Sequence, residues 1–397
     1  MRVLLLSWEY PPHVVGGLGR HVAGIAPALV EKGVELHLIT PRWSGGEREE
    51  KSDGLIVYRV DPPDAPTPDF YTRAWQTNIQ LEQVGGRLCQ EKGFDLIHNH
   101  DWLTAFSAVA LKRHFKIPLL STIHATEQGR ARGHLVTDQQ RAIHSIEWWL
   151  TYESWRVVCC SHFMAAEVSS SFKTPLNKID VIPNGVKADR YARWDRVDLG
   201  RFSSMYALPG EKIVFHVGRI VHEKGVSVLI EAVPLVLAEN PEAKFVIAGT
   251  GQLLSALRHR AWELEVGDKV LFTGFISDDD RDRLYKVASC AVFPSLYEPF
   301  GIVALEAMAA RAPVVVSLVG GLQEVVKHAE TGITVYPDNV ESLAWGINHT
   351  LARPDWAAQR ARNAYKAVLE EYSWHGIAQQ TAQVYERVVA ERAKTDW

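Results

Sequence analysis

The sequence predicts an α/β fold made of two doubly wound parallel sheets, on three observations. Short apolar runs typical of buried strands alternate with longer stretches in which apolar residues recur at helical spacing. This alternation begins twice, first near Val3 and again near Ile213. The chain has 397 residues, which is enough for two domains of ordinary size. Alternating strands and helices favour a parallel sheet with helices on both faces.

The first half opens with an apolar strand over residues 3–7 and a helix whose apolar positions run from Leu18 to Leu29. The strand that resumes at Val34 completes one strand–helix–strand unit, and helical patterns separate most of the strands after it. The strands predicted after the first are 34–40, 55–60, 95–99, 118–123, 157–160 and 179–182.

The second half follows an irregular, charged stretch that runs from Asn184 to about Leu199. We therefore predict a first domain over 1–195 and a second over 200–373. A last amphipathic helix is predicted within 374–397. The strands predicted in the second domain are 212–217, 244–248, 269–273, 290–293, 313–317 and 332–335.

Composition limits the class of protein. Hydrophobic residues make up 47% and charged residues 23%, as in a globular protein, and the net charge of −4 gives no reason to expect nucleic acid binding. We find no signal peptide and no stretch long enough to cross a bilayer. The Trp-rich stretch 143–156 allows peripheral membrane docking at most, and buried packing is the preferred interpretation. The cysteines lack metal-ligand spacing, which favours a reducing cytoplasm, and they are Cys89, Cys159, Cys160 and Cys290.

The most informative segment places two carboxylates around a strand-to-helix turn. Glu298 lies in the turn, and Glu306 lies about two turns into the helix that begins near Ile302. Between them, Phe300 and Gly301 leave backbone N–H groups at the helix N-terminus, where hydroxyls and anions are held well. Carboxylates accept hydrogen bonds from paired sugar hydroxyls. The alternative is a helix with one glutamate near its start and the other on its solvent face.

A basic turn opens the second domain. Arg219 offers a planar fork for phosphate oxygens, and Lys224 offers a compact point charge five positions later. The turn predicts a diphosphate site, although such residues in a loop are often only solvated surface. Gly249 and Gly251 follow the next strand, at the edge where open α/β sheets bind ligands; turn chemistry alone explains them equally well.

The glycine turn of the first domain is a second candidate for a phosphate or sugar contact. Gly16 and Gly17 permit close backbone approach and positive φ before a helix N-terminus, which favours a phosphate or sugar contact over a purely structural turn. A dinucleotide site is disfavoured, because Val22 stands where its third glycine belongs. The second strand also ends in Thr40 rather than in an acidic residue.

Histidines follow two later strands of the first domain. His124 lies just past the strand over 118–123, where a hydrogen-bonded core histidine is the simplest alternative to a functional one. The string His98-Asn-His-Asp-Trp102 also ends a strand. Its His98, His100 and Asp101 suggest a metal cluster, but no matching distal ligand motif is evident.

As a set, these segments resemble the retaining nucleotide-sugar glycosyltransferases of family 4. The pair Glu298 and Glu306 resembles that family's acidic signature, Arg219 and Lys224 match its basic pair, and the string ending at Trp102 looks like that of glycogen and starch synthases. The resemblance implies a GT-B fold, in which two Rossmann-like domains face a central cleft. It also implies that 1–195 is the acceptor side, that 200–373 binds the nucleotide sugar, and that helix 374–397 packs back on the first domain.

The resemblance further implies the site residues. His124, Glu298, Arg219 and Lys224 would be catalytic, and Asp101, His124 and Glu298 would lie near the sugar and acceptor. The donor would contact Gly16, Gly17, Arg219, Lys224, Gly249, Gly251, Phe300, Gly301, Ile302 and Glu306.

The activity implied is transfer of a hexosyl unit, most simply glucosyl, from a UDP- or ADP-sugar to an acceptor hydroxyl with retention. No metal and no other cofactor is implied, and the oligomeric state is left open.

One departure matters: Val14 stands where glycogen and starch synthases carry a phosphate-site lysine, which disfavours polymer elongation. The alternatives are such elongation, a GT-B epimerase or phosphorylase, and a non-catalytic sugar-nucleotide sensor. Acceptor contacts are expected from the loops 43–53, 62–75 and 129–140.

Overall fold

The computed structural model describes residues 1–43, 45–64 and 66–397, and these form two compact units. Unit 1 comprises Met1–Gly185 and Trp374–Trp397, and unit 2 comprises Val186–Ser373. Residues 186–195, which the sequence predicts to be part of the first domain, belong to unit 2 in the structure. The backbone N–H of Val186 donates to the carbonyl of Tyr372 at 2.9 Å, and the buried Asp282 accepts from Arg190 at 2.6 Å, so this segment is held by unit 2.

Unit 1 contains an eight-stranded sheet within the described ranges, in the order β3-β4-β2-β1-β5-β6-β7-β8. The paired strands are parallel except for β3, which pairs with β4 in antiparallel fashion. The strands are β1 (Arg2–Leu6), β2 (Glu35–Pro41), β3 (Glu49–Ser52), β4 (Leu55–Val60), β5 (Leu96–His100), β6 (Leu119–Ile123), β7 (Arg156–Cys159) and β8 (Ile179–Val181).

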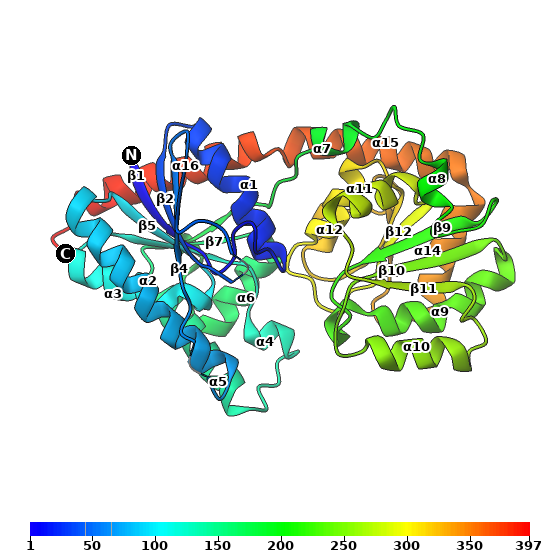
Figure 1. Ribbon diagram of the computed structural model, residues 1–397, viewed down its shortest axis with the longest axis horizontal. Helices are drawn as coiled ribbons and strands as arrows, with labels where there is room; N and C mark the ends of the chain where they lie inside the picture. The colour runs from blue at the N-terminus through cyan, green and yellow to red at the C-terminus, as the bar shows by residue number, and fades with distance from the viewer. Residues whose placement is uncertain (44, 65) are drawn as a thin grey trace. The chain divides into compact units, whose positions relative to one another are not determined.

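Helices cover both faces of this sheet (Figure 1). On one face α1 and α16 lie side by side, and on the other α2, α3 and α5 pack in succession. The helices of unit 1 are α1 (Gly17–Glu31), α2 (Phe70–Lys92), α3 (Ala105–Phe115), α4 (Glu127–Arg130), α5 (Asp138–Glu153), α6 (His162–Phe172) and α16 (Trp374–Arg392).

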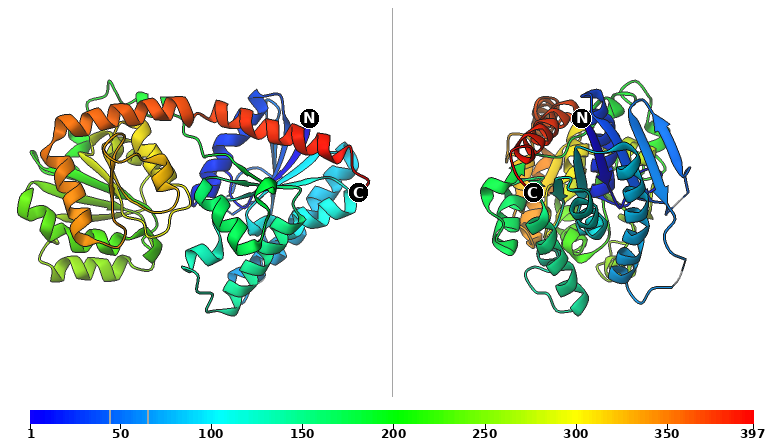
Figure 2. Two further views of the ribbon diagram at one scale, coloured as in Figure 1. Left: turned by 180° about the vertical axis from the view of Figure 1, so that it is seen from behind. Right: turned by 90° about the vertical axis from the view of Figure 1, so that its left-hand side faces the viewer.

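The last helix packs onto the first one, as Figure 2 shows from two sides. Its first residue, Trp374, is buried, and two glycines make room for the indole ring. An ideal Cβ added at Gly24 would lie 2.1 Å from Trp374 Cε2, and one added at Gly185 would lie 2.7 Å from Trp374 Cδ2. Further along α16, the buried Tyr385 OH lies 2.7 Å from His98 Nδ1 on β5. These contacts bury one face of α16 in the core of unit 1.

Unit 2 contains a six-stranded parallel sheet, again within the described ranges, in the order β11-β10-β9-β12-β13-β14. Its buried strands are rich in Val, Ile and Phe, as expected for strands covered on both faces. The strands are β9 (Lys212–Val217), β10 (Ala243–Ala248), β11 (Val270–Gly274), β12 (Cys290–Phe293), β13 (Val314–Ser317) and β14 (Ile333–Val335).

The helices of unit 2 also lie on both faces of their sheet (Figure 1). On one face α9 packs against α10 and α14, and on the other α12 packs against α15. The helices are α7 (Asp189–Ala192), α8 (Gly200–Ser203), α9 (Val226–Glu239), α10 (Leu254–Glu263), α11 (Asp278–Val287), α12 (Ile302–Ala309), α13 (Leu322–Val325), α14 (Val340–Ala352) and α15 (Pro354–Glu371).

The predicted loops differ more from the structure than the predicted strands do. Within 43–53, residues Glu49–Ser52 form the edge strand β3, and α2 begins at Phe70 inside the predicted loop 62–75. Those two predicted loops also include residues 44 and 65, which lie outside the described residues. The predicted loop 129–140 overlaps the end of α4 and the start of α5. Among the described residues, no helix is long and apolar enough to cross a membrane.

We expect Gly24→Ala to destabilise unit 1, because the added methyl group would meet the ring of Trp374 between α1 and α16. Overpacking of this kind costs about 1–3 kcal/mol. Gly86→Ala is the matched control, since Gly86 lies in helix α2 of the same unit and an added Cβ would have nothing within 4 Å. That change should stabilise by about 0.5–1 kcal/mol through helix propensity. Urea unfolding of the full chain measures both, and equal shifts of the same sign would contradict the proposed packing.

Candidate active site

The strand order of unit 2 reverses between β9 and β12, and the predicted basic and acidic segments leave the sheet at that point. The chain after β9 contains Arg219 and Lys224, and the chain after β12 contains Glu298. Open α/β sheets bind ligands at the carboxyl ends of their strands, beside such a switch point. The topology therefore brings both segments to the edge where a ligand is expected.

These two loops approach each other through their backbones. The N–H of Leu296 donates to the carbonyl of Glu223 at 2.8 Å. Gly225 has φ +65°, and an ideal Cβ there would lie 1.8 Å from the carbonyl oxygen of Pro294, so this position requires glycine.

The side chains of the two loops meet as well. Lys224 Nζ donates to Glu298 Oε2 at 2.7 Å, and Ser295 Oγ donates to the same oxygen at 3.3 Å. Arg219 pairs with Glu223 at 3.0 Å, and 53% of the Arg219 side chain stays exposed. The structure thus brings three predicted site residues to one edge of the sheet.

The other predicted glycines of unit 2 have steric roles of their own. An ideal Cβ at Gly249 would lie 1.8 Å from the carbonyl oxygen of Gly218, and one at Gly251 would lie 2.2 Å from that of Ile220. The N–H of Ile220 also donates to the carbonyl of Thr250 at 2.8 Å. Backbone packing therefore explains these glycines, in agreement with the alternative interpretation. It also fixes the loop after β10 against the loop that contains Arg219.

Helix α12 begins as the sequence predicts, but its glutamate faces inward. Gly301 caps the helix with φ +106°, Phe300 is buried, and Ile302 is the first helical residue. Glu306 is 5% exposed, so the alternative that it lies on the solvent face of the helix is wrong. Its Oε2 lies 3.4 Å from Arg281 Nε and 3.5 Å from Tyr285 OH. Sequence reasoning missed Arg281, which comes from another helix and has no motif around it.

Unit 1 repeats the topology, with its switch point between β1 and β5. After β1, Gly16 caps α1 in an extended conformation with φ −143°, so the permitted positive φ is not used there. An ideal Cβ at Gly16 would have nothing within 4 Å, which leaves open space beside the start of α1, where Gly17 is the first residue. Glu9, another residue that the sequence analysis missed, accepts from the N–H of Val15 at 2.8 Å and from that of Gly16 at 3.0 Å. Its carboxylate thus accepts hydrogen bonds from backbone N–H groups at a helix N-terminus, which are the kind of groups that bind phosphate.

Asp101 follows β5 in a strained conformation. Its φ of 57° and ψ of 178° belong to a region that is nearly exclusive to glycine, and such strain tends to mark functional sites. Its Oδ1 accepts from the backbone N–H of His124 at 2.7 Å, which ties the ends of β5 and β6 together. Burial raises the pKa of the Asp101 carboxyl to about 6.

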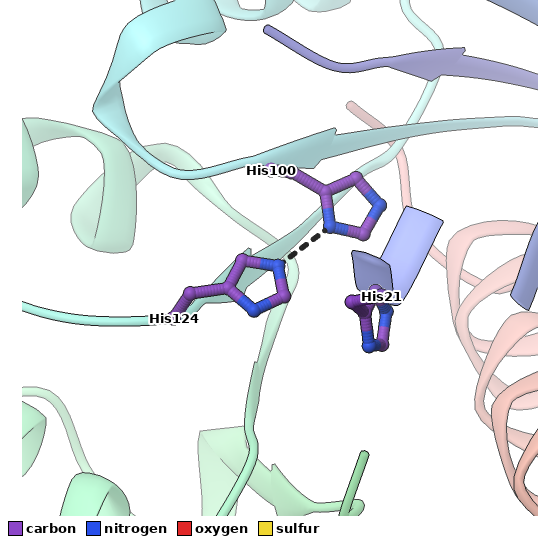
Figure 3. Close-up of side chains that lie close together, drawn as sticks. All are labelled: His21, His100 and His124. Carbon is purple, nitrogen blue, oxygen red and sulfur yellow. Dashed lines mark hydrogen bonds between the residues drawn. The ribbon is translucent and has the colours of Figure 1, made fainter. Parts of the chain in front are cut away.

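Three histidine rings from different elements converge in unit 1 (Figure 3). His100 Nδ1 lies 3.0 Å from His124 Nε2, and the ring centre of His21 on α1 lies 4.8 Å from that of His124. His98 lies outside this group, because its Nδ1 is bonded to Tyr385 and its Nε2 to Thr122. The ring centre of His98 lies 4.4 Å from that of His100, so the structure does bring these two histidines together as the sequence suggested. Because both nitrogens of His98 are engaged, the ring nitrogens that can converge on one point are those of His21, His100 and His124.

The position of His21 in the sequence contains a signal that could have identified it. It lies three residues after Leu18 and four before Ile25, on the buried stripe of α1. A histidine on such a stripe needs polar partners in the interior. Here His21 Nδ1 lies 2.7 Å from Asn184 Oδ1.

Comparison with known proteins agrees with these features. Two family profiles match, "Glycosyltransferase Family 4" over residues 15–190 and "Glycosyl transferases group 1" over residues 205–367. An uncharacterized glycosyltransferase of Methanocaldococcus jannaschii is 43% identical over 391 residues, with 97% of this chain and 98% of the relative covered. A glycogen synthase of Mycobacterium tuberculosis is 35% identical over 401 residues, with 97% and 94% covered.

Among solved structures, sucrose-phosphate synthase from Thermosynechococcus elongatus superposes with a TM-score of 0.84 at 26% identity, with 98% of this chain and 99% of that chain covered. This likeness extends over both units and agrees with the predicted pair of Rossmann-like, doubly wound domains. The chain therefore belongs to glycosyltransferase family 4 and has the GT-B type of fold.

Proposed function

We propose that this glycosyltransferase moves a hexosyl unit, most simply glucosyl, from a UDP- or ADP-sugar to an acceptor hydroxyl with retention of configuration. The observation that supports it most directly is the pairing of Lys224 with Glu298 at the switch point of unit 2, where the loop after β9 also contains Arg219. The reaction requires no metal ion.

The cations of unit 2 would bind the diphosphate of the donor. Charge grows on the leaving diphosphate as the glycosidic bond breaks, so cations fixed in place stabilise the transition state more than the ground state. Lys224 is held by Glu298 at 2.7 Å, and Arg219 is half exposed and able to turn towards phosphate oxygens. Glu298, once Lys224 contacts phosphate, would accept hydrogen bonds from sugar hydroxyls, and Glu306 would hold the ribose.

His124 would lie beside the sugar in unit 1. Burial lowers the pKa of its ring to about 3, so the imidazole is uncharged at neutral pH. A neutral ring places no positive charge near the anomeric carbon, which becomes oxocarbenium-like as the bond breaks. Asp101 holds the backbone of His124 in place through the 2.7 Å hydrogen bond. The leaving phosphate would accept the proton of the acceptor hydroxyl, so no protein nucleophile is needed.

Related structures support this class of donor. Anabaena HepE was solved with UDP-glucose and shares the fold at a TM-score of 0.77 and 19% identity. Starch synthase IV from Arabidopsis thaliana was solved with ADP and acarbose, at a TM-score of 0.78 and 19% identity. The glycogen synthase relative favours glucose as the transferred sugar.

Elongation of a glucan is the second candidate, because a relative of 35% identity is named glycogen synthase. Val14 argues against it, since it replaces a phosphate-site lysine of the polymerising enzymes. In the structure Val14 packs near Gly19, where an ideal Cβ would lie 3.0 Å from Val14 Cγ1. Profiling short sugars against glucan primers, with whichever of UDP-glucose and ADP-glucose is turned over, separates the two candidates.

We expect Lys224→Ala to lower kcat by about 100-fold or more, because a charge contact fixed before the reaction is worth about 3–4 kcal/mol in the transition state. The affinity for UDP should fall, whereas the affinity for uridine, which has no phosphate, should change little. Lys366→Ala is the control, since Lys366 is exposed on α15 and pairs only with Glu370 among the ion pairs described here. Turnover by Lys224→Ala near the wild-type rate would contradict the role of Lys224.

The stereochemistry of the product tests the proposed mechanism separately. With an α-linked donor such as UDP-glucose, retention predicts an α-linked product from the first turnover. Proton NMR of the reaction mixture distinguishes the two anomers by the coupling of the anomeric proton. Hydrolysis of the donor in place of transfer would give free sugar and should be measured in parallel. A β-linked product formed first would show that the enzyme inverts.

A further inference from the structure

The histidine cluster of unit 1 has chemistry that the proposed reaction does not use. It consists of His21 on α1, His100 at the end of β5 and His124 just after β6 (Figure 3). His100 is fully buried, His21 is 6% exposed and His124 is half-buried. The three residues come from distant parts of the chain, so the fold rather than a local motif brings them together.

The spacing of the rings matches that of a tris-imidazole metal site. The ring centres of His21 and His100 lie 5.3 Å apart, those of His21 and His124 4.8 Å, and those of His100 and His124 5.3 Å. Tetrahedral zinc with Zn–N bonds of about 2.0–2.1 Å places such ring centres about 5 Å apart. The backbone therefore already holds the three rings at the required distance.

The nitrogen atoms need only small movements to converge on an ion. One ring nitrogen from each residue lies within 4.8 Å of the other two, and the nitrogens of His100 and His124 are 3.0 Å apart. A tetrahedral ion holds nitrogens about 3.3 Å apart.

The polar surroundings also suit a metal. His100 Nε2 is buried and has no hydrogen-bond partner in the part of the chain that the structure describes, so the cluster is not a satisfied hydrogen-bond network. The Nδ1 of His21 donates to Asn184 Oδ1, which leaves the lone pair on Nε2, and the Asp101 carboxylate fixes the backbone of His124. Partners of this kind orient the ligands of known metal sites.

The protonation state of the rings favours binding as well. Burial lowers the pKa of His21 and of His124 to about 3 and that of His100 well below its ordinary value. Burial thus favours the uncharged form of each ring, which is the form of imidazole that binds a metal.

We infer that His21, His100 and His124 form a binding site for a late first-row divalent cation of the Zn²⁺ class, with the fourth position open to water. Three neutral imidazoles favour Zn²⁺, Ni²⁺, Cu²⁺ and Co²⁺ over Mg²⁺ and Ca²⁺, which prefer oxygen ligands. The open position distinguishes the site from closed structural zinc sites. Access to the ion is through His124, the least buried of the three.

Titration of the full-length protein with Co²⁺ tests the site, because four-coordinate Co²⁺ gives an intense visible absorption band that the octahedral aqueous ion lacks. We expect one equivalent to bind with such a band, and Zn²⁺ to displace it. Loss of an outer-shell partner alone weakens metal sites by about 10–100-fold, so His124→Ala, which removes a ligand, should weaken binding by at least about 100-fold. His100→Gln is the second variant and should have the same effect.

His134→Ala is the matched control, since His134 is exposed in the same unit and lies outside the cluster. Circular dichroism and urea unfolding of each variant verify that it is folded. The inference is overturned if the wild-type protein gives no four-coordinate band, if either ligand variant retains wild-type affinity, or if His134→Ala loses binding to the same extent.

A consequence for activity rests on the proposed function. An ion on His124 would take that ring from the sugar, so Zn²⁺ should inhibit transfer at the concentration at which it binds, and EDTA should restore activity. The two ideas can fail separately. If Zn²⁺ binds but transfer continues unchanged, the role of His124 beside the sugar is wrong and the metal site stands.

Discussion

The candidate site of unit 2 depends on the backbone contact between the loops after β9 and β12. Gly225 allows this contact, because any side chain there would meet the carbonyl of Pro294 at 1.8 Å. The contact places Lys224 within 2.7 Å of Glu298, although the two residues are far apart in the sequence. Glu298 is buried, and a buried carboxylate without a partner costs several kcal/mol. The contact between the two loops therefore positions Lys224 beside Glu298, and the pairing of Lys224 with Glu298 in turn offsets the cost of burying this carboxylate.

Unit 1 uses the same topology for a different chemistry. Its switch point gathers neutral imidazoles and the strained Asp101, where that of unit 2 gathers cations and carboxylates. Burial explains the difference, since desolvation lowers the pKa of each histidine while Lys224 and Arg219 remain paired with carboxylates.

The strands of both sheets could be predicted from the sequence, because their apolar runs are local and continuous. The edge strand β3 could not, since Glu49–Ser52 is exposed and polar and forms only by pairing with β4. The positions of His124, Asp101 and Glu298 at the ends of strands could also be predicted, because each follows an apolar run in the sequence.

The residues that contact the candidate site residues from other elements could not be predicted, because such contacts leave no local pattern in the sequence. Arg281 reaches Glu306 from α11, and Glu9 folds back onto the start of α1, and neither contact leaves a periodic signal. His21 is an intermediate case. Its place on the apolar stripe of α1 marks it as buried, but only the fold reveals that His100 and His124 lie beside it.

The protein supplies its own carboxylates to groups that would bind a diphosphate. Glu9 accepts from the amides of Val15 and Gly16 in unit 1, and Glu298 pairs with Lys224 in unit 2. These groups are therefore satisfied before a donor binds, and a nucleotide must displace or share a carboxylate. Its affinity then reflects the difference between two anions rather than the full strength of the new contacts. A diphosphate carries more charge than one carboxylate, whereas a neutral sugar carries none, so this exchange favours the donor over free sugar at the same edge.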